Sequence, residues 1–165
     1  MKLHHHSCMN KIPMTVNGFE KLQFELKKLL NEDRPNIIAA IAEARSHGDL
    51  SENAEYQYAK EQQSLIEGKI ADLESAITRA EVIDVKSLKS DEIKFGATVE
   101  IKDDENGEIV TYQIVGDYES DIKNFKLSVS SPLARGLINK TIDDVVEINS
   151  PKGQKSYTIK SVKYI

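Results

Sequence analysis

The chain has 165 residues, of which 39% are hydrophobic and 30% charged, a composition typical of a folded globular protein. No apolar run approaches the roughly 20 residues that a membrane-spanning helix needs, and the N-terminus lacks the apolar segment of a secretion signal. The net charge of −5 excludes a protein that wraps nucleic acid through overall positive charge. Any contact with nucleic acid therefore requires a local basic patch.

Residues 1–8 read MKLHHHSC and are interpreted as an added leader, so that the native chain begins at Met9. This leader holds three of the four histidines and the only cysteine, which leaves His47 as the single native histidine. A native chain without cysteine excludes a disulfide scaffold, a zinc site built on thiolates and a cysteine nucleophile. Without an export signal, the expected compartment is the cytoplasm.

Residues 9–83 carry apolar side chains at the spacings of three and four that are typical of paired helices. The stripes consist of Phe19, Leu22, Leu26, Leu29, Ile37, Ile41 and Ala44 in a first arm and Ile66, Ile70, Leu73, Ile77 and Ala80 in a second. The first stripe slips by one position near Pro35, where we expect a kink or a helix restart capped by Asp33. Gly48 is expected to end the first arm and Asp49 to start the second. The sequence therefore predicts an antiparallel hairpin whose arms reach about 45 Å.

The second half of the chain has a different pattern. Residues 84–95 carry six charges and no clear period, and they are predicted to form a linker. Beyond Gly96 apolar and polar residues alternate, which is typical of half-buried strands, and Asn106-Gly107 is a hairpin signal. Strands are predicted at 98–102, 109–115, 125–129, 145–149 and 156–163, with a short helix at 131–138. Residues 96–165 should therefore form a small, mostly antiparallel sheet with one helix, which makes the fold class α+β.

The turn of the hairpin concentrates carboxylates. Asp49 and Glu52 are three residues apart, which places them on one face of a starting helix. One interpretation is a variant of the capping box, which would contribute about 1 kcal/mol to helix stability. The other is that two hard oxygen ligands are presented to Mg²⁺, which commonly takes one or two protein carboxylates. Such a pair could hardly hold the ion alone, so the second interpretation requires a partner that completes the site.

Two basic residues flank this turn. Arg45 lies one turn before it and Lys60 lies two turns after it. They form either a small basic patch beside the acidic tip or ordinary solvated charges on the flank of a coiled coil. His47 alone is interpreted as a polar loop residue. From the residues alone, the sequence thus predicts a hairpin with an acidic tip followed by a small β-rich domain.

Three segments carry a resemblance. Residues 41–56 read IAEARSHGDLSENAEY, residues 131–138 read SPLARGLI and residues 12–15 read IPMT. The first is similar to the signature of the bacterial transcript-cleavage factors GreA and GreB, the second resembles the second signature of that family, and the third resembles its opening. The resemblance extends from Met9 to Ile165, and the acidic composition favours the GreA branch of the family over the GreB branch.

The resemblance implies a function. Members of this family bind backtracked RNA polymerase, and their hairpin enters the secondary channel of the polymerase. The tip acids, matched here by Asp49 and Glu52, help to hold a second Mg²⁺ within the polymerase complex and position a water molecule. The polymerase then hydrolyses its own RNA near the 3′ end, so that the factor is a monomeric helper and not itself an enzyme. The catalytic role and the metal-ligand role both pass to Asp49 and Glu52.

The resemblance also assigns roles outside the tip acids. Arg45 and Lys60 match the basic patch that guides the RNA 3′ segment. The C-terminal domain is implied to be FKBP-like and to dock on the polymerase rim, with Ser131 and Pro132 as candidate contacts. The chain departs from the family at Asn139, where glycine is usual; asparagine tolerates a positive φ better than most residues.

Two other functions compete with this one. A secondary-channel protein could modulate or inhibit the polymerase by occupancy alone, but such a protein need not keep both Asp49 and Glu52. A stand-alone metal-dependent nuclease would need more ligands than one histidine and two tip carboxylates provide. The sequence therefore favours a cleavage-stimulating factor.

Overall fold

The computed structural model describes residues 10–48 and 53–165. The described chain divides into two units. One is a helical unit within Phe19–Ala80, and the other combines Lys11–Gly18 with Glu81–Ile165. None of the helices in the described residues is long and apolar enough to cross a membrane.

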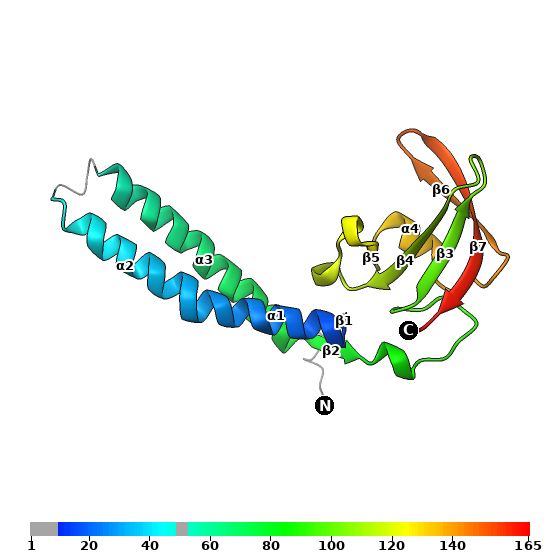
Figure 1. Ribbon diagram of the computed structural model, residues 1–165, viewed down its shortest axis with the longest axis horizontal. Helices are drawn as coiled ribbons and strands as arrows, with labels where there is room; N and C mark the ends of the chain where they lie inside the picture. The colour runs from blue at the N-terminus through cyan, green and yellow to red at the C-terminus, as the bar shows by residue number, and fades with distance from the viewer. Residues whose placement is uncertain (1–9, 49–52) are drawn as a thin grey trace, which may run out of the picture. The chain divides into compact units, whose positions relative to one another are not determined.

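The first unit is the predicted antiparallel hairpin (Figure 1). Its elements are helix α1 (Val16–Lys28), whose first three residues belong to the second unit, a π-helical segment η2 (Leu29–Asp33), helix α2 (Arg34–Arg45) and helix α3 (Ala54–Thr78). The buried side chains are Leu22, Leu29 and Ala44 in the first arm and Ala59, Ile70, Leu73 and Ala76 in the second. Ile37 and Ile41 are half-buried, which confirms the predicted stripe on both sides of its phase slip.

The π-helical segment explains the slip. The expected restart capped by Asp33 is wrong, because Asp33 has helical backbone angles (φ −66°, ψ −45°) and its side chain caps no N–H group. The chain instead stays helical and inserts one wide turn, which adds one residue and shifts every later side chain by one position. The Lys28 Nζ lies 3.2 Å from the Asp33 Oδ1, and these residues are five apart. Pro35 fits at the start of α2, where its missing N–H costs little.

One strand precedes the helices of the hairpin along the chain and another follows them, and the two form a small sheet. It pairs strand β1 (Ile12–Thr15) with strand β2 (Ala80–Ile83). This sheet was not predicted from the sequence, because the helical pattern extends to about Ile83 and Ala80 continues the apolar stripe of the second arm. Met14 in β1 is fully buried and Thr15 is nearly so, so this strand is anchored and not a frayed terminus.

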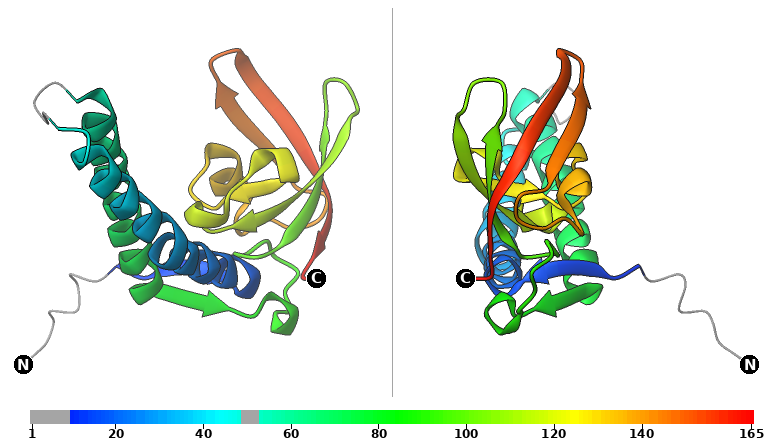
Figure 2. Two further views of the ribbon diagram at one scale, coloured as in Figure 1. Left: turned by 60° about the vertical axis from the view of Figure 1, so that its left-hand side comes forward. Right: turned by 90° about the vertical axis from the view of Figure 1, so that its right-hand side faces the viewer.

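The C-terminal domain contains a five-stranded sheet in the order β5-β4-β3-β7-β6. Its elements are β3 (Thr98–Asp103), β4 (Ile109–Val115), β5 (Lys126–Ser128), helix α4 (Pro132–Leu137), β6 (Val145–Ser150) and β7 (Gly153–Lys163). All pairs are antiparallel except β4 with β5. Figure 2 shows the curled sheet with α4 against it. The predicted α+β class, a helical hairpin followed by a small β-rich domain, is confirmed; the FKBP-like character of that domain stays a prediction.

The core of this domain lies between the sheet and α4. Along β3 the side chains alternate, and Val99 and Ile101 are fully buried. They join Ile114 of β4, Ile159 of β7 and Leu137 of α4 in one hydrophobic cluster. Because one face of each strand is buried, this alternation also fixes the strand register.

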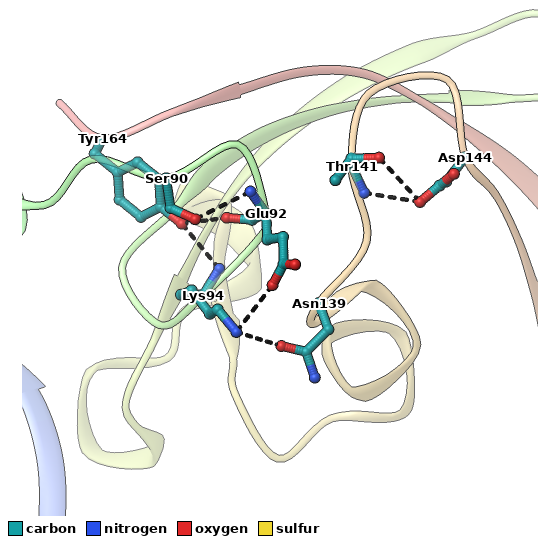
Figure 3. Close-up of polar contacts among 7 residues, drawn as sticks. All are labelled: Ser90, Glu92, Lys94, Asn139, Thr141, Asp144 and Tyr164. Carbon is teal, nitrogen blue, oxygen red and sulfur yellow. Dashed lines mark hydrogen bonds and ion pairs between the residues drawn. The ribbon is translucent and has the colours of Figure 1, made fainter.

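Residues 84–95 belong to the C-terminal domain, although the sequence predicted a linker. The side chain of Ile93 is fully buried in the hydrophobic cluster, and its N–H and carbonyl bond the backbone of Lys140 and Asn139, each at 2.8 Å. The Lys94 Nζ also donates to the Asn139 Oδ1 at 2.6 Å, and the Tyr164 hydroxyl donates to the Glu92 carbonyl at 2.6 Å (Figure 3). Asn139 has the positive φ predicted for it, 71°.

This anchoring predicts a large cost for truncating Ile93. Ile93→Ala removes a fully buried side chain and should lower the free energy of unfolding by about 3 kcal/mol, as measured by chemical denaturation. Ile109→Ala is the matched control, because that side chain is 56% exposed and its loss should cost less than about 1 kcal/mol. Equal costs for the two variants would show that residues 84–95 behave as a free linker.

Candidate functional site at the hairpin tip

The first arm ends as the sequence predicts. Helix α2 ends at Arg45, and the Ser46 N–H still bonds the carbonyls of Ala42 and Glu43. Gly48 follows with φ of 105°, in the region where glycine avoids the strain that a Cβ would cause. The helix thus ends before Gly48, whose left-handed backbone belongs to the turn that follows the first arm.

The second arm begins later than predicted. Helix α3 starts at Ala54, and Asn53 is its N-cap, with its Oδ1 accepting from the Tyr56 N–H at 3.0 Å. The Asn53 Nδ2 also donates to the Ala44 carbonyl, which lies near the end of α2, at 2.7 Å. The expectation that Asp49 starts this helix is therefore wrong. One amide caps α3 and ties it to α2.

The predicted acids Asp49 and Glu52 lie outside the described residues, so their roles remain predictions. The described residues beside them add to the acidic character of the tip. His47 lies between two exposed carboxylates, with its Nδ1 3.5 Å from the Glu55 Oε2 and its Nε2 3.9 Å from the Glu43 Oε1. Within 10–48 and 53–165, no three carboxylate, imidazole or thiol side chains are placed to hold a metal ion together.

Arg45 and Lys60 are both exposed. The side chains of Arg34 and Glu67 mark one face of the hairpin, because they bridge α2 and α3. Arg45 follows Arg34 by eleven residues and Lys60 precedes Glu67 by seven, which are close to three and two full helical turns. Arg45 and Lys60 therefore share this face, which we call the basic face.

The bridge that marks the basic face has fork geometry. The Arg34 Nε donates to the Glu67 Oε2 at 2.8 Å, and its terminal nitrogen donates to Oε1 at 2.7 Å. This pairing lowers the pKa of Glu67 and raises that of Arg34, chiefly through the side-chain hydrogen bonds. Arg45 and Lys60 have no such anion among the described residues; the Lys60 Nζ contacts only the neutral Gln63 Oε1, at 3.2 Å. Their charges are thus available to an anionic partner.

The candidate docking residues Ser131 and Pro132 begin helix α4. The Ser131 hydroxyl donates to the Ser128 carbonyl at 2.7 Å and accepts from the Ala134 N–H at 3.3 Å, while Pro132 is exposed. Asp117, which no sequence motif singles out, accepts hydrogen bonds from the hydroxyls of Ser128 and Ser130. These bonds lower the pKa of Asp117. The segment before Pro132 is therefore held by a network and not left as an open loop.

Both units of the chain match known families. Residues 12–82 match the family described as transcription elongation factor, N-terminal, and residues 88–164 match the family described as transcription elongation factor GreA/GreB, C-terminal. The chain is 56% identical to a transcription elongation factor GreA of a Chelativorans species, over 94% of this chain and 99% of that one. It is 55% identical to the GreA of Caulobacter vibrioides, over 95% of this chain and 100% of that one.

Solved structures give a weaker likeness. The GreA factor homolog 1 protein of Thermus thermophilus is 24% identical, with a TM-score of 0.44 over 93% of this chain and 99% of that one. A GreA/GreB elongation factor from Nitrosomonas europaea is 21% identical, with a TM-score of 0.41 over 93% of this chain and all of that one.

The cap at Asn53 predicts a local stability effect at the tip. Asn53→Ala removes the cap of α3 and its bond to Ala44, and it should lower the free energy of unfolding by about 1 kcal/mol or slightly more. Asn53→Asp keeps a capping oxygen but loses the donor, so its cost should be smaller. Thermal unfolding followed by circular dichroism measures both, with the exposed Glu61→Ala as the control. A stable Asn53→Ala variant would contradict the assignment of the cap.

Proposed function

Because the chain belongs to the GreA/GreB family of transcription elongation factors, we propose that it binds backtracked RNA polymerase and stimulates cleavage of the RNA 3′ segment by the polymerase itself. The observation that carries this proposal is the match of both units to the family, together with the tip sequence of residues 41–56 on a long hairpin. Such a factor would act as a monomer in the cytoplasm and would not be an enzyme by itself.

The proposed mechanism uses the hairpin to carry two acids into the polymerase. The arm from Val16 to Arg45 is about 45 Å long at about 1.5 Å per residue, which is long enough to reach deep into a channel. Asp49 and Glu52 would share with the polymerase the ligation of a second Mg²⁺, whose charge stabilises the oxygens that attack and leave in phosphodiester hydrolysis. Two carboxylates suit this ion, which takes few protein ligands and leaves other positions to water and phosphate.

The structure supports this role for the acids indirectly. Asn53, and neither Asp49 nor Glu52, provides the side-chain cap of α3. The capping interpretation of the two acids therefore loses support, and in the sequence both acids lie between Gly48, which follows the first arm, and Asn53, which caps the second.

We assign RNA guidance to the basic face and docking to the C-terminal domain. Arg45 and Lys60 share one face, carry no bridging anion among the described residues and flank the tip, so their charges can attract the RNA phosphates near the 3′ end. Ser131 and Pro132 lie where the Asp117 network holds the backbone, which favours a preformed contact surface for the polymerase.

The central prediction concerns the tip acids. Asp49→Asn and Glu52→Gln keep the size of each side chain but remove a metal-ligating charge. Each should reduce the rate of RNA cleavage in a stalled polymerase complex by about 100-fold or more, because metal stabilisation of charge contributes several kcal/mol. Binding to the polymerase and thermal stability should change little. Raising the Mg²⁺ concentration should restore part of the rate in either single variant.

The controls separate the competing functions. Glu61→Gln makes the same charge change farther along the second arm and should cleave as the wild type does. A reaction without polymerase should show no cleavage, and cleavage there would favour a nuclease. Wild-type protein that binds the complex without stimulating cleavage would favour a factor acting by occupancy. If Asp49→Asn binds and stimulates as well as the wild type, the metal-ligand role is wrong.

The basic face gives a second prediction. The Arg45→Ala/Lys60→Ala double variant should crosslink the RNA 3′ end several-fold less than the wild type at low salt, and the difference should shrink at high salt as phosphate contacts are screened. Lys69→Ala is the matched control, because Lys69 follows Lys60 by nine residues, which is two and a half turns, and so lies on the opposite face of α3. Equal crosslinking by the double variant and Lys69→Ala would contradict a role of the basic face in guiding the RNA.

A further inference from the structure

The carboxylate of Glu119 holds the start of helix α1. Its Oε2 accepts from the N–H groups of Thr15 and Gly116, each at 3.0 Å, and its Oε1 accepts from the Thr15 hydroxyl. The Thr15 hydroxyl oxygen in turn accepts from the Gly18 N–H at 3.0 Å, which is the N-cap arrangement for α1. All four of these residues lie in the second unit, where one carboxylate orients both the backbone and the cap of the residue that precedes α1.

Two glycines make this contact possible. A Cβ added at Gly18 would overlap the side chain of Glu119, and a Cβ added at Gly116 would overlap the carbonyl oxygen of Pro13. Gly18 is placed within α1, where glycine is a poor helix former. The absence of a side chain there gives up helix propensity and leaves room for the carboxylate.

We propose that Glu119 is a positioning residue for transcript cleavage, which fixes the start of the hairpin through Thr15 and so sets where the tip acids arrive. This inference rests on the proposed function. An arm of about 45 Å converts a tilt of about 5° at its base into a displacement of about 4 Å at its tip. A misplacement of about 1 Å can reduce a reaction rate about 100-fold, so a loose base would lower the cleavage rate even where docking is intact.

Three variants test the contact from both sides. Glu119→Ala removes the carboxylate, and Gly18→Ala displaces it while raising the helix propensity of α1. Glu119→Gln keeps one acceptor oxygen for the two N–H groups and should restore much of the function. Glu108→Ala is the matched control, because Glu108 is exposed and its carboxylate makes no hydrogen bond or ion pair with the residues that the structure describes; only its N–H is bonded, to the Asn106 side chain.

Cleavage kinetics provide the first readout. At saturating factor, Glu119→Ala and Gly18→Ala should cleave RNA in the stalled complex about tenfold more slowly or worse, while the factor concentration that gives half the maximal rate should change by less than about threefold. Loss of rate in Gly18→Ala cannot come from unravelling of α1, since alanine favours the helix. Unchanged maximal rates in both variants would overturn the proposal.

A second readout does not depend on the polymerase. Spin labels at Ala42→Cys and Lys152→Cys, in a Cys8→Ser background, report the spread of distances between the hairpin and the C-terminal domain. Glu119→Ala and Gly18→Ala should broaden this distribution, whereas Glu108→Ala should not. An unchanged distribution would overturn the proposal. Broadening in a protein whose wild type stimulates no cleavage would instead overturn the proposed function and leave the role of Glu119 at the base of the arm in place.

Discussion

Two helices of this length remain paired only if the apolar face of each keeps turning toward the other. The first arm would lose this alignment at its slip in apolar spacing, and the π-helical segment Leu29–Asp33 restores it by inserting one residue without ending the helix. Directly after this segment, the Arg34 side chain forms a bidentate bridge to Glu67, which joins the second part of the first arm to α3. The contact of Asn53 with Ala44 and the common orientation of the basic face both depend on the phase that is set there.

The base of the hairpin obeys a different constraint. A long arm transmits any looseness at its origin to its tip, so its first turn needs a contact that controls direction as well as position. In the proposed role, the Glu119 carboxylate would meet this need because it accepts from a backbone N–H and from a hydroxyl of the same residue, Thr15. A single hydrogen bond would leave rotation about its axis free. Two bonds to one residue, with a third to Gly116, restrict that rotation.

The features that follow from local periodicity could be predicted from the sequence, and those decided by distant contacts could not. In β3 and β4 apolar and polar residues alternate, and the two strands flank a strong turn signal, so the bounds of both strands were predicted to within one residue. Residues 84–95 contain few apolar side chains, too few to show a period, yet one of them, Ile93, completes the core. At the tip, Asp49 and Asn53 are both good N-cap residues. The bond from Asn53 to the Ala44 carbonyl favours Asn53, and only the paired helices reveal that bond.

Because Asn53 is the N-cap of α3, different residues provide the structural contact and the proposed chemistry of the tip. An asparagine can cap α3 and donate to α2 at once, whereas a carboxylate can only accept. With Asn53 performing both tasks, the charges of Asp49 and Glu52 are not required to start the helix. Glu43 and Glu55, at the ends of the two arms that the structure describes, are both exposed, so water screens most of the repulsion between them. What repulsion remains favours binding of a cation. A cation site built on Asp49 and Glu52, as proposed, would therefore need a partner that supplies further ligands and excludes water.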